Sequence, residues 1–255
     1  MKRRIALTVG GTVAAVSIGF ATWHSAVFAG TSHRAPAAPA AEPSIANGVA
    51  TFQRTARLAD VASACTATAN AESPGAVVLR QGLDDAHVSV TLSVPCAIQL
   101  AAGGFSLRDV RLSSRTLNIS DSAFGQGQNT ISLYGVSLTG SSDAGLLVAL
   151  SDPAGRVTIN GGSLRYPAGI AVQARGDRST VLLSHTTLSA RGPGSAGIAV
   201  TASTKHGVIT GTQPKLDADA IGFVADHCAI TLGDRAIDCG AARLAGDLQA
   251  QLATP

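Results

Sequence analysis

The side chains best placed for chemistry stand at matching positions of a repeat that recurs about every 25 residues between Phe105 and Val200. Three positions after the apolar residue that opens each repeat lie Arg108, Tyr134, Asn160 and Ser184, and the next positions are Asp109, Gly135, Gly161 and His185. A guanidinium can meet the carboxylate of an acidic sugar, and an aromatic face can stack on a sugar ring. The candidate ligand-contacting face predicted from the sequence consists of Arg108, Tyr134, Asn160, Arg165 and His185.

The same positions carry no pair of carboxylates on successive repeats. Hydrolysis of a glycosidic bond needs two carboxylates that face the bond, one as acid and one as base or nucleophile. The fragment Asp84–His87 is interpreted as a solvated turn, because neighbouring residues of a strand point to opposite faces. His206, in Lys205-His206-Gly207, is interpreted as a turn residue. The sequence therefore assigns no catalytic residue, no metal site and no cofactor.

The elements that position these side chains are short strands. Four segments share the spacing apolar–x–apolar–x–x–small–x–apolar, and they begin at Phe105, Ile131, Val157 and Val181. A second strand-like segment follows each of them, and clusters of Gly, Ser, Asp and Pro separate the strands. Two strand ladders at one period indicate a solenoid in which each coil stacks on the previous one.

The repeated unit resembles the coil of right-handed parallel β-helix proteins, the pectin-lyase-like superfamily. The resemblance rests on Val157–Leu164 with Ala168–Val172, and on Thr180–Leu188 with Ala196–Val200. It implies an all-β, right-handed parallel β-helix of about six coils. Since the superfamily includes polysaccharide lyases, hydrolases, esterases and adhesins, the resemblance does not select one activity.

Natural solenoids cover their exposed ends with caps. The segment Thr55–Thr68 is predicted to be an N-terminal capping helix. Residues 241–255, with Leu244, Leu248 and Leu252 at helical spacing, are predicted to cap the last coil or to bind a partner. The predicted β-helix domain spans residues 51–240 and includes the N-terminal cap.

The chain has four cysteines, an even number that favours disulfides in an exported protein. Of the three connectivities, the preferred one joins Cys65 to Cys96 and Cys228 to Cys239, one bridge at each end of the repeats.

The N-terminus carries export signals. Lys2-Arg3-Arg4 precedes the apolar run Ile5–Ala21, and Val27-Phe28-Ala29 offers a cleavage site, so residues 1–29 are predicted to be a signal peptide. An uncleaved membrane anchor is the alternative. Residues 30–50 are an Ala/Pro-rich linker.

Charge helps to exclude some partners. Without the three basic residues of the signal, the chain has 16 Lys and Arg against 16 Asp and Glu, which argues against binding to nucleic acid. We expect a secreted or cell-envelope scaffold, non-catalytic, whose adhesin-like surface contacts a glycan or an envelope protein. The alternatives are a small polysaccharide lyase or glycoside hydrolase that acts on acidic glycans, and assembly through a sheet edge or the linker.

Overall fold

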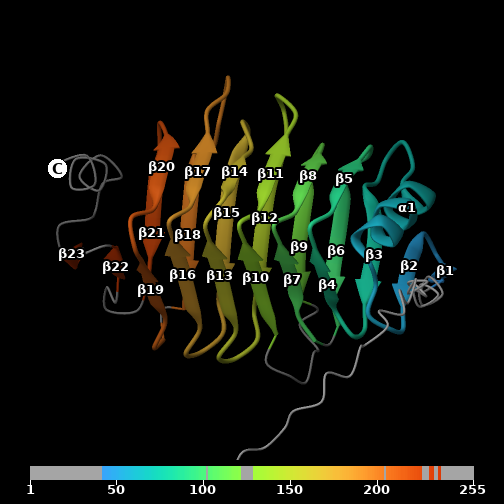
Figure 1. The fold of residues 1–255 in the computed structure, drawn as a ribbon, viewed down its shortest axis with the longest axis horizontal. Helices are drawn as coiled ribbons and strands as arrows, with labels where there is room; N and C mark the ends of the chain where they lie inside the picture. Colours follow the sequence, from blue (N-terminus) through green and yellow to red (C-terminus); the bar gives the residue numbers. More distant parts are fainter. Residues whose placement is uncertain are drawn as a thin grey trace, which may run out of the picture. The chain divides into compact units, whose positions relative to one another are not determined.

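A computed structural model of the chain describes residues 42–101, 103–121, 129–203, 205–225, 230–232 and 235–236. The described residues form three β-sheets and one helix, α1 (Leu58–Thr68). The strands of each sheet come from successive turns of the chain, and neighbouring turns pair in parallel (Figure 1). The chain is therefore a parallel β-helix, as its sequence predicts.

The three sheets are named A, B and C here. Sheet A has the order β1 (Ser44–Ala46), β2 (Val49–Phe52), β3 (Gly75–Leu79), β6 (Cys96–Leu100), β9 (Leu117–Asp121), β12 (Gly145–Leu150), β15 (Gly169–Ala174), β18 (Ile198–Ala202), β21 (Ile221–Val224). Sheet B has the order β4 (Leu83–Ala86), β7 (Phe105–Arg108), β10 (Thr130–Tyr134), β13 (Arg156–Asn160), β16 (Thr180–Ser184), β19 (Val208–Gly211), β22 (Ile230–Leu232), β23 (Arg235–Ala236). Sheet C has the order β5 (Ser89–Leu92), β8 (Arg111–Ser114), β11 (Ser137–Gly140), β14 (Ser163–Arg165), β17 (Thr187–Ala190), β20 (Lys215–Ala218).

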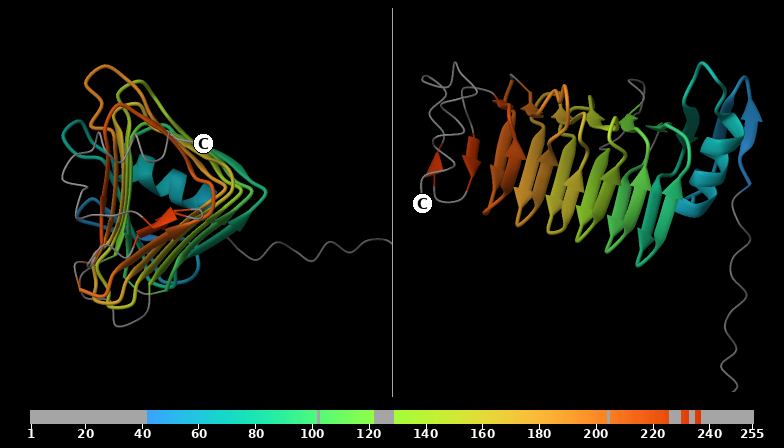
Figure 2. Two further views of the ribbon diagram at one scale, coloured as in Figure 1. Left: turned by 90° about the vertical axis from the view of Figure 1, so that its left-hand side faces the viewer. Right: turned by 90° about the horizontal axis from the view of Figure 1, so that it is seen from above.

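Within the described part of the chain, six turns contain one strand of each sheet, and β21 and β22 begin a seventh turn. Viewed along its axis, this coil has the three sheets as the sides of a triangle (Figure 2). The six complete turns match the number of coils predicted from the sequence.

The core consists of aliphatic side chains stacked from turn to turn. Ile131 pairs in register with Val157, which pairs with Val181, and all three are fully buried. Leu138, Leu164 and Leu188 form an equivalent buried row in sheet C. Since each buried aliphatic side chain contributes about 1.5–3 kcal/mol relative to an exposed one, these rows stabilise every interface between turns.

Each turn has three strands, whereas the sequence pattern suggested two. The eight-residue pattern that begins at Phe105 covers both β7 and β8, which meet at a corner. Asp109 turns the chain there with a φ of 53°, and Gly135, Gly161 and His185 do so in the next turns. The alternation of buried and exposed residues resumes after this bend, so the two strands together resemble one longer strand.

The N-terminal end is covered by a hairpin and by α1. Strands β1 and β2 are joined through Asn47 and Gly48, both with positive φ, as a tight hairpin turn requires. Strand β2 pairs with β3, so sheet A begins inside the range assigned to the linker. Helix α1 lies across the end of the coil in both views (Figure 2), which confirms the predicted N-terminal cap.

A disulfide joins Cys65 of α1 to Cys96 of β6, with a Cα–Cα distance of 5.7 Å. This bridge is the predicted one, and it ties the cap to the second complete turn. The predicted signal peptide 1–29, the bridge between Cys228 and Cys239, and the predicted C-terminal helix in 241–255 lie outside the described residues.

Candidate functional site

The outer face of sheet B carries three of the five predicted ligand-contacting side chains in one row. Tyr134 pairs in register with Arg108 on one side and with Asn160 on the other. The guanidinium carbon of Arg108 lies 5.5 Å from the centroid of the Tyr134 ring, within the range of a cation–π contact. Arg108 and Asn160 are exposed and Tyr134 is half-buried, so all three side chains are accessible to a ligand.

His185 lies beside this row, on the corner between sheets B and C. Its φ is 50°, and its backbone N–H donates to the carbonyl of Thr212 at 2.7 Å. The residue in register with Asn160 is instead Ser184, which is buried. The bend at the corner therefore separates the imidazole from the flat face that carries Tyr134.

Arg165 lies on sheet C, between Thr139 and Ser189 in register. The structure therefore does not bring it into the row on sheet B. Its neighbour Tyr166, the second of the two tyrosines of the chain, is fully buried, and its hydroxyl lies 2.6 Å from Ser114 Oγ. Burial raises the pKa of Tyr166 to about 12, against a smaller lowering by this hydrogen bond. Tyr134 is thus the tyrosine that can stack on a ligand.

A different hollow lies on the outer face of sheet A, and the sequence reasoning did not find it. It is a groove of about 360 Å³ that crosses four neighbouring strands, β9, β12, β15 and β18. Its floor is the in-register row Asn118, Leu147, Ala171 and Ala199. Gly145 and Gly169, where two of these strands begin, widen it because they have no side chain.

Small residues also let the backbone approach closely at the rim of this groove. Gly197 has a φ of 79°, and a Cβ at this position would lie 2.2 Å from the carbonyl oxygen of Ala220. Its N–H donates to Ser195 Oγ at 3.1 Å. Glycine is therefore required there by both the conformation and the space.

The outer face of sheet A is uncharged over its whole described length. From β3 to β21 the outward residues of the described strands are Gly, Ala, Val, Leu, Asn, Gln, Ser or Thr, as the alternation of burial shows. The recurrence of Ala171 and Ala199 next to Gly169 and Gly197 was visible in the sequence, but it is also typical of a merely tight coil.

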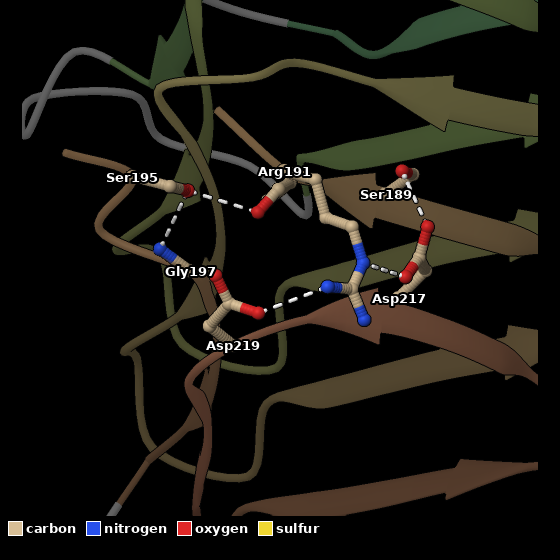
Figure 3. Close-up of polar contacts among 7 residues, drawn as sticks. Ser189, Arg191, Ser195, Gly197, Asp217 and Asp219 are labelled. Carbon is tan, nitrogen blue, oxygen red and sulfur yellow. Dashed lines mark hydrogen bonds and ion pairs between the residues drawn. The ribbon is translucent and has the colours of Figure 1, made fainter. Parts of the chain in front are cut away.

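An ion-pair cluster holds the loop that borders the groove (Figure 3). Arg191 donates from Nη1 to Asp219 Oδ1 at 2.9 Å and from Nε to Asp217 Oδ1. Ser189 Oγ donates to Asp217 Oδ2 at 3.1 Å. The hydrogen bond from Arg191 lowers the pKa of Asp217. The cluster joins the end of β17 to β20, one turn further along, and so anchors the loop that ends at Gly197.

Two histidines lie next to carboxylates at other corners. His206 Nδ1 lies 3.0 Å from Asp177 Oδ1, and this hydrogen bond lowers the pKa of Asp177. His87 Nδ1 lies 3.6 Å from Asp109 Oδ2. All four side chains are at least one third exposed, so these pairs are solvated surface contacts.

Asp84 and Asp85 lie on strand β4, where a solvated turn was expected. Asp84 points outward, whereas Asp85 faces inward and accepts a hydrogen bond from the N–H of Leu58, at the first turn of α1. Burial, partly offset by this bond, raises the pKa of Asp85. The carboxylate caps a helix from another part of the chain, which no local pattern could have indicated.

Among the described residues, no three His, Cys, Asp or Glu side chains are grouped so that they could hold a metal ion. None of the helices in this part of the chain has the length and apolar character needed to span a bilayer. Comparison of the chain with protein-family models, curated proteins and solved structures finds no match.

Proposed function

We propose that this chain is an exported β-helix of the pectin-lyase-like type whose role is binding, and that the groove on sheet A contacts an uncharged protein surface in the cell envelope. The observation that carries the proposal is the groove itself, which is apolar, crosses four turns and lies on a face without charge. Support for export comes from Lys2-Arg3-Arg4 and the apolar run after it.

The chemistry of the face favours a protein partner over an acidic glycan. A polyanion needs cationic donors, and the described outward residues of sheet A offer none. Alanine and glycine rows instead let a flat apolar segment approach the strands closely. Exposed apolar patches on soluble proteins mark interaction surfaces when they are continuous.

The size of the face favours a reversible contact. The seven strands from β3 to β21 are four to six residues long. At about 4.8 Å apart they cover roughly 30 Å by 15 Å, on the order of 450 Å². A stable specific interface buries about 800 Å² on each partner. The face thus accounts for more than half of such an interface, and bordering loops such as the one held by Arg191 would contribute the rest.

Photo-crosslinking in the producing cell tests this proposal. A benzophenone amino acid at Leu147, in the groove, is expected to give an adduct of one defined mass, whereas the same probe at Ser132, on sheet B, gives none. Adding Ala171→Asp, which puts a charge in the groove, should abolish the adduct. Adding Thr139→Asp, which puts the same charge on the outer face of sheet C, should preserve it.

The same adducts from both positions, or an adduct that survives Ala171→Asp, would contradict the proposal. Circular dichroism of each purified variant checks that the β-helix is intact. This control distinguishes a lost contact from a lost fold.

A second candidate function is glycan contact on sheet B, because Arg108 lies over the ring of Tyr134 beside Asn160. Binding of oligogalacturonate or alginate oligomers should weaken at least tenfold in Arg108→Gln and remain unchanged in the control Arg165→Gln. Analysis of the same mixtures for unsaturated or reducing ends tests the lyase and hydrolase alternatives. Unaltered binding by Arg108→Gln would remove this candidate.

A further inference from the structure

The corner between sheets A and B contains two buried aspartates beside a buried asparagine. Asp121 is the last residue of β9 and faces inward, in the row that contains Leu79 and Leu100 in the preceding turns. Asp152 lies at the same corner of the next turn, two residues after the end of β12. Asp121 is 8% exposed, Asp152 is 6% exposed and Asn129 is fully buried.

The two aspartates are in direct contact through the backbone. Asp121 Oδ2 accepts hydrogen bonds from the N–H of Ser151 and, at 2.9 Å, from the N–H of Asp152. These bonds engage one oxygen of Asp121. The backbone of Asp152 is therefore held against the Asp121 carboxylate, and Oδ2 of Asp152 is itself buried.

Asn129 belongs to the same corner. Its backbone N–H is a hydrogen-bond partner of the Asp152 carboxylate, and its carbonyl accepts from Arg156 N–H at 3.4 Å. The N–H of Arg156 donates to the carbonyl of Asn129, and in the next two turns the N–H groups of Thr180 and Val208 donate in the same way to Gly155 and Ser179. Ser179 therefore occupies the position of Asn129, two turns further along. The Ser179 hydroxyl reaches inward to the carbonyl of Ala174, at the end of β15.

The residue that the Ser179 hydroxyl reaches, Ala174, corresponds to Asp121 of β9 through the pairing of β9, β12 and β15. Ser179 Oγ also accepts a hydrogen bond from the N–H of Ser203 at 3.1 Å, so this hydroxyl both donates and accepts. Asn129 Oδ1, Asn129 Nδ2 and Asp152 Oδ2 are buried and make no hydrogen bond in the structure. The great majority of buried polar atoms in proteins are hydrogen-bonded, so the two oxygens among these three atoms are available to an electron-pair acceptor.

We propose that Asp121, Asn129 and Asp152 bind a calcium ion. The available donors are carboxylate and amide oxygens, the hard ligands that calcium prefers, and they come from two successive turns. A divalent cation would neutralise two buried like charges and satisfy Asp152 Oδ2 and Asn129 Oδ1 together. Binding would then fasten one turn of the coil to the next at a position where other turns have aliphatic or alanine side chains.

Thermal unfolding of the full exported chain in 2 mM calcium chloride and in EGTA tests the proposal. For a dissociation constant near 10⁻⁴ M, as in extracellular calcium modules, Tm is expected to be about 3–6 °C higher in calcium. Titration with terbium, followed by its luminescence, should saturate at one ion per chain. Asp152→Asn and Asn129→Leu should each abolish both responses, whereas Asp143→Asn, at an exposed acid outside the corner, should leave both unchanged.

Asp152→Asn also separates lost binding from damaged folding. Because it removes one of two adjacent buried charges, its Tm in EGTA should equal or exceed that of the unmodified chain. Equal Tm values in calcium and EGTA would overturn the proposal. So would a rise that Asp152→Asn retains, or an equal rise in magnesium chloride at the same ionic strength.

Discussion

Several residues of this chain make hydrogen bonds to distant parts of the backbone that their neighbours in the sequence do not indicate. Arg57 precedes the first turn of α1 without a side-chain cap, and Asp85 of β4 supplies the acceptor instead. Asp121 has a similar role, because its carboxylate receives two N–H groups of the following turn. Aspartates at inward positions thus connect elements that lie 27 and about 30 residues apart in the sequence.

Asp85→Ala should lower the free energy of unfolding by about 1 kcal/mol, since it removes the acceptor at the start of α1. Asp85→Asn keeps a hydrogen-bond acceptor and should lower the free energy of unfolding by less. Urea unfolding followed by circular dichroism measures both. A loss in Asp85→Asn as large as that in Asp85→Ala would contradict the capping role.

The raised pKa of Asp85 predicts how stability changes with pH, and urea unfolding at several pH values measures this change. The folded chain holds this proton more tightly than the unfolded chain, so its stabilising contribution is complete below the ordinary pKa of 3.8. It is lost as the pH rises through the higher folded-state pKa. Asp85→Asn should remove this part of the slope, which begins at the ordinary pKa of 3.8 and extends above it.

Arg191 offers a prediction of the opposite sign. Because its hydrogen bond lowers the pKa of Asp217, Arg191→Gln should raise that pKa toward its ordinary value. The stabilisation from the pair is present above the ordinary pKa and disappears as the pH falls through the lower folded-state pKa. Carboxyl-carbon NMR titration measures the change.

Asp143 is the matched control for this titration, because the hydroxyl of Ser141, and not Arg191, lowers its pKa. Its titration should be identical in both chains. If the pKa of Asp217 is the same in Arg191→Gln, the ion pair between Arg191 and Asp217 does not form in solution.

At the scale of elements, one aromatic side chain determines how three turns of sheet C pack. Tyr166 follows β14, and its hydroxyl reaches Ser114 at the end of β8, 52 residues earlier. Gly140, at the end of β11, lies between them, and a Cβ there would stand 2.6 Å from the Tyr166 ring. The glycine therefore makes room for a tyrosine that crosses a whole turn.

Gly140→Ala should lower the free energy of unfolding by about 1–3 kcal/mol through overpacking. Tyr166→Phe should lower it by about 1 kcal/mol, since the buried hydroxyl of Ser114 loses its partner. Gly222→Ala is the control, because nothing lies within 4 Å of a Cβ at that outward position. Equal stability of Gly140→Ala and Gly222→Ala in urea would contradict this account.

At the scale of the molecule, each turn contacts only the turns beside it, so stability depends on every interface and on both ends. The N-terminal end depends on α1, which the Cys65–Cys96 bridge ties across a separation of 31 residues. A loop of this length corresponds to about 3–4 kcal/mol in the chain-entropy account of disulfides.

The double variant Cys65→Ser, Cys96→Ser should therefore lose about 3–4 kcal/mol of stability under oxidising conditions. The loss should also be local. Hydrogen exchange is expected to accelerate in α1 and β3, whereas β15 and β18 stay protected. Uniform acceleration along the coil, or no change in α1, would show that the bridge does not act as a terminal clamp.

The amino-acid sequence by itself determined the class and the period of the fold. Burial of Ile131, Val157 and Val181 follows from local spacing, because a residue two positions away in a strand returns to the same face. In a coil that repeats this spacing, equivalent residues of successive turns stack on one another. The N-terminal helix and the Cys65–Cys96 bridge followed from the need to close an open end.

Only the tertiary structure decided which outward residues become neighbours. A left-handed residue at each corner, such as Asp109 or His185, redirects the chain, and its effect on direction is not encoded in hydrophobic period. Because of this bend, Tyr134 and Arg108 lie side by side on sheet B, whereas Arg165 lies on sheet C. The groove on sheet A and the buried Asp121–Asp152 corner likewise arise from residues on different turns, because contact between turns depends on the path of the backbone through every corner before it.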